Sequence, residues 1–114
     1  MSINKDDIDL EGWDLHRAAI ENAAEIARAL IARGDEVDVR DDTGWTPLHW
    51  AAAHNSLDAA HLLIEHGADI NSRDDSDFTP LHRAAQKNSS EVACLLIENG
   101  ADTNGIDLSW MESQ

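Results

Sequence analysis

The chain has 114 residues, the length of one domain, with four Trp, one Phe and no Tyr. Its apolar residues are mostly Ala, Leu and Ile, which favours packed helices over strands. The net charge of −15, from 23 acidic and 8 basic residues, argues against a nucleic-acid backbone or an anionic membrane surface as partner, because both attract Lys and Arg.

A repeat of 33 residues organises the chain. Thr46-Pro47-Leu48-His49 recurs as Thr79-Pro80-Leu81-His82. A repeat of this period predicts a solenoid, because one unit cannot bury its own apolar faces. We expect a single domain over residues 1–114. Its parts are repeat 1 at about 8–40, repeat 2 at about 41–73, repeat 3 at about 74–106, and a tail at 107–114 that begins a fourth repeat. The same interval relates Gly34, Gly67 and Gly100; Asn22, Asn55 and Asn88; and Asp41, Asp74 and Asp107.

The first unit departs from the pattern of the other two. Trp13-Asp14 stands where they have Thr-Pro, whereas Leu15, His16 and Gly34 stay in register. A degenerate first unit is typical of a capping repeat, which closes one end of a stack.

The second unit contains signals for two helices. Thr46 suits the N-cap of the first helix, and Pro47 suits the first helical position, where its missing N–H costs nothing. Asn55 tolerates the left-handed conformation and ends this helix after about eight residues. A second helix is expected over about 57–66, and Gly67 ends it.

The third unit repeats these signals with one change in its loop. Asp77 replaces the loop glycine Gly44 of the second unit. Polar, Asp- and Asn-rich segments such as 68–75 predict loops that lead to each Thr-Pro. After Asp107 a fourth unit starts with Leu108-Ser109-Trp110-Met111, which is expected to cover the last helices.

Two longer motifs carry a family resemblance. The second unit reads Asp41-x-x-Gly44-x-Thr46-Pro47-Leu48-His49-x-Ala51-Ala52, then Leu62-Leu63-Ile64-x-x-Gly67-Ala68-Asp69-Ile70-Asn71, and the third unit matches it. From about Ile8 to Asp107 the chain resembles the ankyrin repeat. The resemblance implies an all-α solenoid of stacked antiparallel helix pairs joined by hairpin-like loops. It also implies a concave face of loops and first helices that binds other proteins.

By that resemblance, the residues that bind a partner lie at the loop tips and on the outward side of each first helix. In the second unit these are Asp42, Thr43, Trp45, Trp50, Ala53 and His54, and in the third unit Asp75, Ser76, Phe78, Arg83, Gln86 and Lys87. Arg17, Ile20 and Glu21 extend this surface into the first unit.

Two aromatic residues occupy equivalent loop positions. Trp45 and Phe78 are expected side by side, either as binding hot spots or as packing between neighbouring loops. Surrounding aspartates favour a partner with a basic surface, rich in Lys or Arg. These aspartates are Asp41, Asp42, Asp74 and Asp75.

The histidines do not form a metal-binding pattern. His16, His49 and His82 share one repeat position, which by the resemblance forms hydrogen bonds that tie adjacent repeats together. His61 and His66 are five residues apart, whereas helices that bind zinc place two His four apart on one face. Neither a metal nor another cofactor is predicted.

Nothing in the sequence indicates catalysis. Cys94 lies in an apolar run, but its equivalents are Arg28 and His61, so the register predicts partial exposure on an outer helix. No base that would activate this thiol can be identified. Glycine-rich phosphate loops, nucleophile elbows and Cys/His metal sets do not occur, so no enzyme is predicted.

Two loop asparagines allow two interpretations. Asn71 and Asn104 each follow an aspartate by two residues and a leucine by eight. That context is similar to the ankyrin loops that an asparaginyl hydroxylase of animal cells modifies. The alternative is a loop Asn that bonds to its own backbone.

The prediction for function is a non-catalytic protein–protein interaction module that is monomeric. The alternatives are a structural module that self-associates through Trp110, Met111 and the last helices, a fragment of a larger ankyrin-repeat scaffold, and a regulatory or inhibitory subunit of an enzyme. A cytoplasmic location is expected, because the single Cys forms no internal disulfide, no apolar stretch approaches the ~20 residues of a membrane span, and Met1–Leu10 lacks a signal peptide's apolar region.

Overall fold

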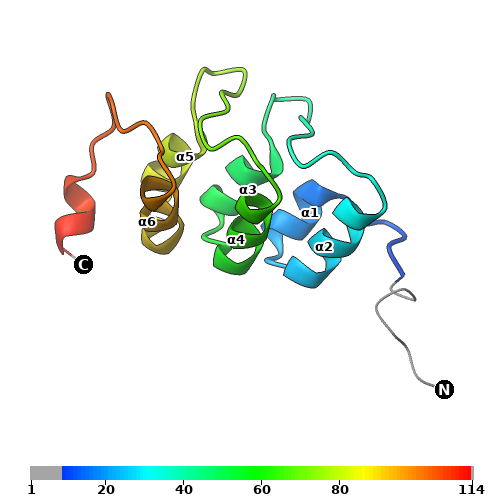
Figure 1. Cartoon of the computed structure of the whole chain (residues 1–114). Helices are drawn as coiled ribbons and strands as arrows, with labels where there is room; N and C mark the ends of the chain where they lie inside the picture. Colours follow the sequence, from blue (N-terminus) through cyan, green and yellow to red (C-terminus); the bar gives the residue numbers. More distant parts are fainter. Residues whose placement is uncertain (1–8, 114) are drawn as a thin grey trace.

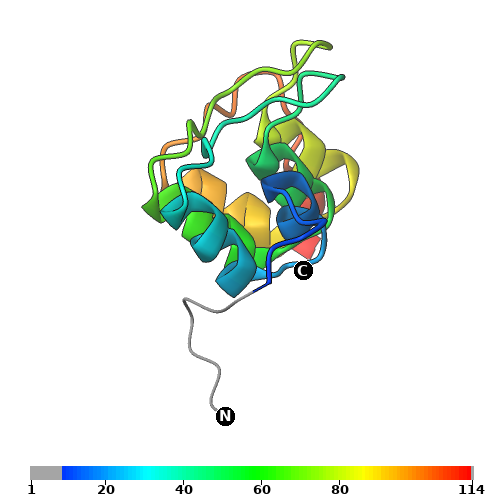
Figure 2. The ribbon, with the colours of Figure 1, turned by 90° about the vertical axis from the view of Figure 1, so that its right-hand side faces the viewer.

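The computed structural model describes residues 9–113, in which three helix pairs stack in a row (Figure 1). The first helices α1, α3 and α5 pack side by side, and α2, α4 and α6 form a second layer (Figure 2). The prediction of an all-α solenoid is confirmed. The helices are α1 (Leu15–Ile20), α2 (Ala24–Ala32), α3 (Pro47–Ala53), α4 (Leu57–Glu65), α5 (Pro80–Gln86) and α6 (Ser90–Glu98), and a 3-10 helix η2 (Ser109–Ser113) follows them.

The first helices start as their sequence predicts. The Thr46 hydroxyl accepts a hydrogen bond from the His49 backbone N–H, and the His49 ring accepts one from the Thr46 N–H at 3.1 Å. Thr79 and His82 form the same capping box. In the first unit Asp14 is the N-cap of α1 and accepts a hydrogen bond from the Arg17 N–H at 2.8 Å.

Three asparagines end the first helices, and two of them also join neighbouring repeats. Asn22, Asn55 and Asn88 have φ values of 55°, 52° and 56°, the left-handed conformation that their positions predicted. The side chain of Asn22 accepts a hydrogen bond from Ala59 N–H in α4, and Asn55 accepts one from Val92 N–H in α6. Asn22 and Asn55 each therefore satisfy a free N–H in the first turn of the next repeat's second helix.

The core lies between the two helix layers. Leucines and alanines from equivalent positions of successive repeats are fully buried there, and the small alanines let the first helices approach closely. The largest buried apolar side chains are Leu15, Leu30, Leu48, Leu63, Leu81, Leu96 and Val92. Among the described residues, no helix has both the length and the apolar character that crossing a membrane requires.

The chain leaves the repeat pattern at Trp110. Asp107 accepts a hydrogen bond from Ser109 N–H at 2.9 Å, as the equivalent aspartates do at the start of the two preceding loops. Trp110 then stands at the position of Gly44 and Asp77, whose φ values are 77° and 66°. A bulky residue is unfavourable in that conformation. The chain instead turns into η2, where Trp110 and Met111 pack against the last repeat.

Candidate functional site

Two hairpins project from the helix stack, the first over residues 40–46 and the second over residues 73–79 (Figure 1). An aspartate organises each tip. The Asp41 carboxylate accepts hydrogen bonds from Thr43 N–H at 2.9 Å and Trp45 N–H at 3.0 Å. Asp74 does the same in the second hairpin, with Ser76 N–H at 2.9 Å and Phe78 N–H at 3.1 Å. The backbone of the two tips is therefore fixed by the same contacts.

The hairpins stack directly on each other. Asp75 N–H donates to the Thr43 carbonyl at 3.1 Å, and Arg40 donates to the Arg73 carbonyl at 2.6 Å. Gly44 makes this approach possible, because a Cβ there would lie 2.8 Å from the Asp75 nitrogen. A side chain at residue 44 would push the hairpins apart.

His16 and His49 tie each hairpin to the preceding repeat, as predicted. The prediction was wrong for His82, whose ring, within residues 9–113, bonds only to Thr79 of its own repeat because no further hairpin follows there. The ring of His49 accepts the Thr46 N–H through Nδ1, so its Nε2 carries the proton and donates to the Phe78 carbonyl at 2.8 Å. His16 contacts the Val39 and Trp45 carbonyls through Nε2 at 2.9 and 3.1 Å. Burial lowers the pKa of His49, so this ring is neutral at neutral pH.

The two organising aspartates bind different partners on their first helices. The second oxygen of Asp41 accepts a hydrogen bond from the Trp50 indole at 2.8 Å. The equivalent oxygen of Asp74 accepts two from the Arg83 guanidinium, at 2.7 and 2.9 Å. The Asp74 side chain is fully buried and that of Arg83 is 14% exposed, so this ion pair is largely removed from water.

Both aspartates are held ionised in the folded protein. Burial raises the pKa of Asp41, but hydrogen bonds from Thr43, Trp50 and Trp45 outweigh it and lower the pKa to about 2. Burial likewise opposes the bonds from the Phe78 backbone and from Arg83, which lower the pKa of Asp74. Asp41 stays negative beside a neutral indole, whereas the charge of Asp74 is compensated by Arg83.

Three aromatic rings and the Arg83 guanidinium stack in a row next to the two hairpins. The Trp50 and Trp45 ring centroids lie 4.4 Å apart. The guanidinium of Arg83 lies over Trp45 at 4.5 Å and over Phe78 at 4.8 Å. The two loop aromatics, expected side by side, are thus joined through Arg83. This guanidinium packs between the loops while it is bound to Asp74.

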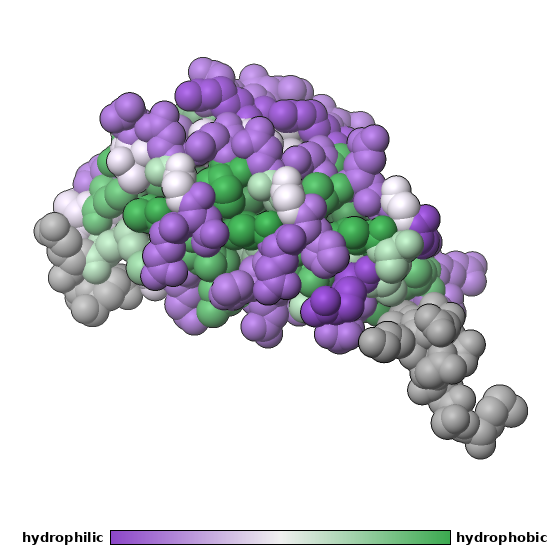
Figure 3. All heavy atoms as spheres, in the orientation of Figure 1, coloured by the Kyte–Doolittle hydropathy of each residue, from purple (hydrophilic) through white to green (hydrophobic). Residues whose placement is uncertain are grey.

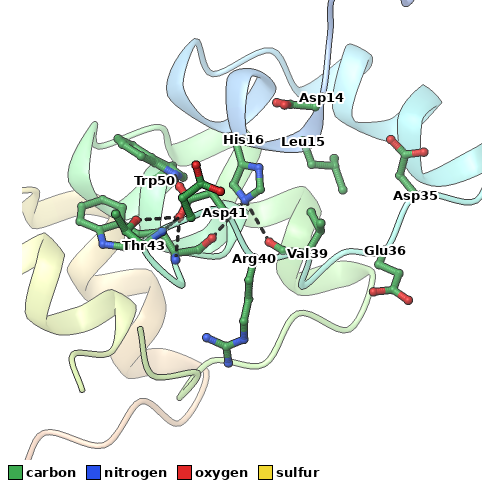
Figure 4. A pocket seen from close by; sticks show the side chains of 12 residues that line it. Asp14, Leu15, His16, Asp35, Glu36, Val39, Arg40, Asp41, Thr43 and Trp50 are labelled. Atoms are coloured by element: carbon green, nitrogen blue, oxygen red, sulfur yellow. Dashed lines mark hydrogen bonds between the residues drawn. The ribbon is translucent and has the colours of Figure 1, made fainter. Parts of the chain in front are cut away.

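A groove of about 810 Å³ opens between the N-terminal end of α1 and the first hairpin (Figure 4). This volume is in the range of sites that bind small molecules or peptide side chains. Its apolar part comes from Leu15, Val39 and the two tryptophans. Polar and charged residues complete the lining, namely Asp14, His16, Asp35, Glu36, Arg40, Asp41, Asp42 and Thr43.

The groove carries a strong negative charge. Five carboxylates line it, whereas Arg40 is the one basic residue that the structure describes in its lining. Arg40 also donates to the Gly44 and Arg73 carbonyls. Polar side chains cover the projecting hairpins, and hydrophobic surface appears lower down, over the helices (Figure 3). Asp35 is paired with Arg33 at 2.9 Å. The groove therefore combines aromatic surface with the negative charge of carboxylates such as Glu36 and Asp42, which have no basic partner among the described residues.

The structure brings only part of the predicted surface into this groove. Asp42, Thr43, Trp45 and Trp50 line it, and His54 stacks on Trp50 at a centroid distance of 6.0 Å. The predicted residues of the third unit lie elsewhere. Ser76 and Phe78 line a polar pocket beyond the second hairpin, Arg83 is bound to Asp74, Gln86 lines a pocket beside η2, and Asp75 and Lys87 are exposed.

Several groove residues were missing from the predicted surface. Asp14, Asp35, Glu36 and Arg40 come from the first unit and the segment after it. One signal for them existed in the sequence: Asp35 and Glu36 stand where the later units have Ala68-Asp69 and Ala101-Asp102. Asp35 is thus an additional acidic residue in the first unit, and it pairs with Arg33 at 2.9 Å.

Two other sequence interpretations have clear outcomes. Cys94 is exposed, so the repeat register was right against its apolar neighbours. The Asn71 side chain does not bond to its own backbone. Its oxygen accepts from Asp102 N–H at 2.8 Å and its nitrogen donates to the Gly100 carbonyl at 3.5 Å, so it links two successive loops. Within residues 9–113, no group of three or more His, Cys, Asp or Glu could hold a metal ion.

Comparison with known proteins supports the repeat interpretation. A family model described as ankyrin repeats, in three copies, matches residues 15–107, which is most of the chain. No curated protein matches the sequence with significance.

Proposed function

Because the chain belongs to the ankyrin-repeat family, we propose that it acts as a protein-interaction module and that the groove beside the first hairpin is its main binding site. Ankyrin repeats are generally protein-interaction modules, and the proposed action is binding without catalysis. The observation that carries the proposal is the combination in one groove of two tryptophans and five carboxylates.

The partner segment that fits this groove carries Lys or Arg next to an apolar side chain. Trp45 and Trp50 offer flat apolar surface for the apolar side chain and for the aliphatic part of a basic one. Glu36 and Asp42 line the same groove without a basic partner among the described residues and attract the positive charge. The long-range attraction raises the association rate and weakens with added salt.

The binding test begins with a peptide-display selection on the whole chain. We expect the selected peptides to be enriched in Lys and Arg flanked by apolar residues. The strongest peptide is then titrated against the double variant Glu36→Gln, Asp42→Asn, which removes two exposed carboxylates from the groove lining. We expect a roughly fivefold to tenfold loss of affinity, because each exposed charge contributes up to about 1 kcal/mol.

A matched variant separates local from overall charge. Glu65→Gln, Glu98→Gln removes the same charge from exposed positions at the ends of α4 and α6. It should leave the affinity nearly unchanged. Equal losses in both double variants, or selected peptides without basic residues, would count against the groove as the site.

A further inference from the structure

The contacts between the two hairpins show which donor and acceptor groups hold one hairpin against the next. On the first hairpin side, Arg40 donates to a carbonyl at 2.6 Å, His49 donates to a carbonyl at 2.8 Å, and the Thr43 carbonyl accepts an N–H at 3.1 Å. All three contacts reach backbone atoms of the second hairpin. The first hairpin therefore recognises a following loop by its backbone.

The equivalent groups of the second hairpin are Arg73, Ser76 and His82, each 33 residues further on. The chain enters η2 at Ser109, so within the described residues no third hairpin stacks on these three groups. Arg73 donates within its own hairpin, to the Asp77 carbonyl at 3.1 Å. Among the described residues, no hydrogen bond joins His82 Nε2 or the Ser76 carbonyl to another group.

These groups line an end pocket of about 330 Å³, which also includes Phe78, Thr79, Asp77, Asp102 and Asn104. The Nδ1 atom of His82 accepts the Thr79 N–H at 3.0 Å, so Nε2 carries the ring proton. Burial, together with Arg73 and Arg83, lowers the pKa of His82, so the ring is neutral. The pocket thus presents a neutral N–H donor beside a guanidinium.

We propose that this end pocket binds an extended loop of a partner protein through backbone carbonyl groups, with His82 and Arg73 as donors. The docked loop takes the place that the second hairpin occupies on the first. This contact lies at the opposite edge of the hairpin pair from the groove and does not depend on the function proposed for the groove. In the same lining Asp77 is paired with Arg73 at 3.5 Å, whereas the Asp102 carboxylate can receive a basic side chain of the partner.

Asp77 limits how closely such a loop approaches. At the equivalent Gly44, a Cβ would lie 2.8 Å from the nitrogen of the next loop. Asp77 adopts the same left-handed conformation, with φ 66°, but carries a Cβ. The N–H contact to the Ser76 carbonyl is therefore obstructed, whereas the two donor contacts remain open. A copy of the chain's own hairpin therefore keeps the two donor contacts at this edge but lacks the third contact, so it binds weakly.

The probe for this pocket is a cyclic peptide with the sequence of residues 72–79, which forms the loop that docks on the first hairpin. Its binding to the ¹⁵N-labelled chain is followed by NMR. We expect shifts at Arg73, Asn104 and the His82 ring, with a Kd on the order of 1 mM because few contacts form. His82→Asn keeps an acceptor for Thr79 but has no Nε2 donor, and should weaken binding about fivefold to tenfold.

A second variant should bind the peptide more tightly than the wild type. Asp77→Gly removes the obstructing Cβ and should tighten peptide binding severalfold, while Lys87→Ala, an exposed change outside the pocket, should leave it unchanged. A scrambled cyclic peptide is the control ligand. The proposal is overturned by no shifts at several millimolar peptide, by equal binding to His82→Asn, or by shifts confined to Trp45 and Trp50. Shifts at those two indoles would belong to the groove.

Discussion

The two hairpins have the same backbone but different chemistry. Asp41 and Asp74 organise them with equivalent hydrogen bonds, and each carboxylate then binds the residue nine positions later on its first helix. That residue is Trp50 in one repeat and Arg83 in the other. The indole leaves the charge of Asp41 uncompensated and lines a groove, whereas the guanidinium compensates the charge of Asp74 and lies between the loop aromatics.

This difference shows how a repeat scaffold separates structure from function. The positions that fix the backbone are kept in both hairpins, and a single outward position decides whether the aspartate stays uncompensated. A second position, Gly44 or Asp77, decides whether another loop stacks on the hairpin. Each of these differences can be tested by a substitution that makes one hairpin resemble the other.

The largest expected effect tests the ion pair. Asp74→Asn should lower the free energy of unfolding by about 3 kcal/mol, because it leaves the largely buried Arg83 guanidinium without its counter-charge. Asp41→Asn should cost less, about 2 kcal/mol, because Trp50 is neutral and no buried charge is left unpaired. Chemical denaturation of both variants measures the difference. Equal losses would mean that the two carboxylates are held in the same way.

The next effect tests the stacking of the hairpins. Gly44→Ala should destabilise the protein by about 2 kcal/mol, because it combines an unfavourable positive φ with a contact against the Asp75 nitrogen. Asp77→Gly should stabilise it by about 0.5–1 kcal/mol, because glycine adopts the positive φ of this position without strain and the exposed ion pair with Arg73 contributes little. Thermal denaturation distinguishes the opposite signs, and a loss of stability in Asp77→Gly would contradict the comparison.

Acid sensitivity gives a third test. The pKa of Asp41 is lowered from 3.8 to about 2, so its contribution to stability is present above pH 3.8 and is lost as the pH falls toward 2. Asp41→Asn should flatten the stability profile in that pH window. Urea denaturation at a series of pH values measures the slope. A wild-type slope that persists in the variant would assign the acid sensitivity to other carboxyl groups.

The smallest effect concerns the loops below the hairpins. Asp38 stands at the position of Asn71 and accepts the Asp69 N–H at 3.1 Å. Burial raises the pKa of Asp38, and the neighbouring Asp69 adds to the shift, so the charged form is unfavourable in the folded state. Asp38→Asn should therefore stabilise the protein by about 0.5 kcal/mol at pH 7. Asn71→Asp is the reverse change and should destabilise it.

The sequence predicted the scaffold well because local chemistry determines it. The Thr-Pro caps, the left-handed asparagines and the exposure of Cys94 all follow from position in the repeat. Of the residues that line the groove, the sequence predicted Trp50 and, apart from Arg40, those of the first hairpin, but not those of the first unit. Asp35 and Glu36 reach it through the path of the segment after α2, which the repeat pattern alone does not describe. Arg83 was predicted as a contact residue, but its pairing with Asp74 depends on side-chain geometry that spacing does not reveal.

We propose that Trp50 leaves the charge of Asp41 uncompensated, so that the groove beside the first hairpin can bind a basic partner. Trp50→Arg gives this hairpin the arrangement of the second one, with a guanidinium next to Asp41. Asp58→Asn is the control, because it makes the same change in charge at an exposed position at the start of α4.

The decisive measurement is the affinity of the selected basic peptide for these two variants and the wild type, by calorimetric titration. The predicted result is a loss of about tenfold or more in Trp50→Arg, with little change in the melting temperature and unchanged binding to Asp58→Asn. Unchanged affinity in a folded Trp50→Arg variant would contradict the role of Trp50 in binding a basic partner.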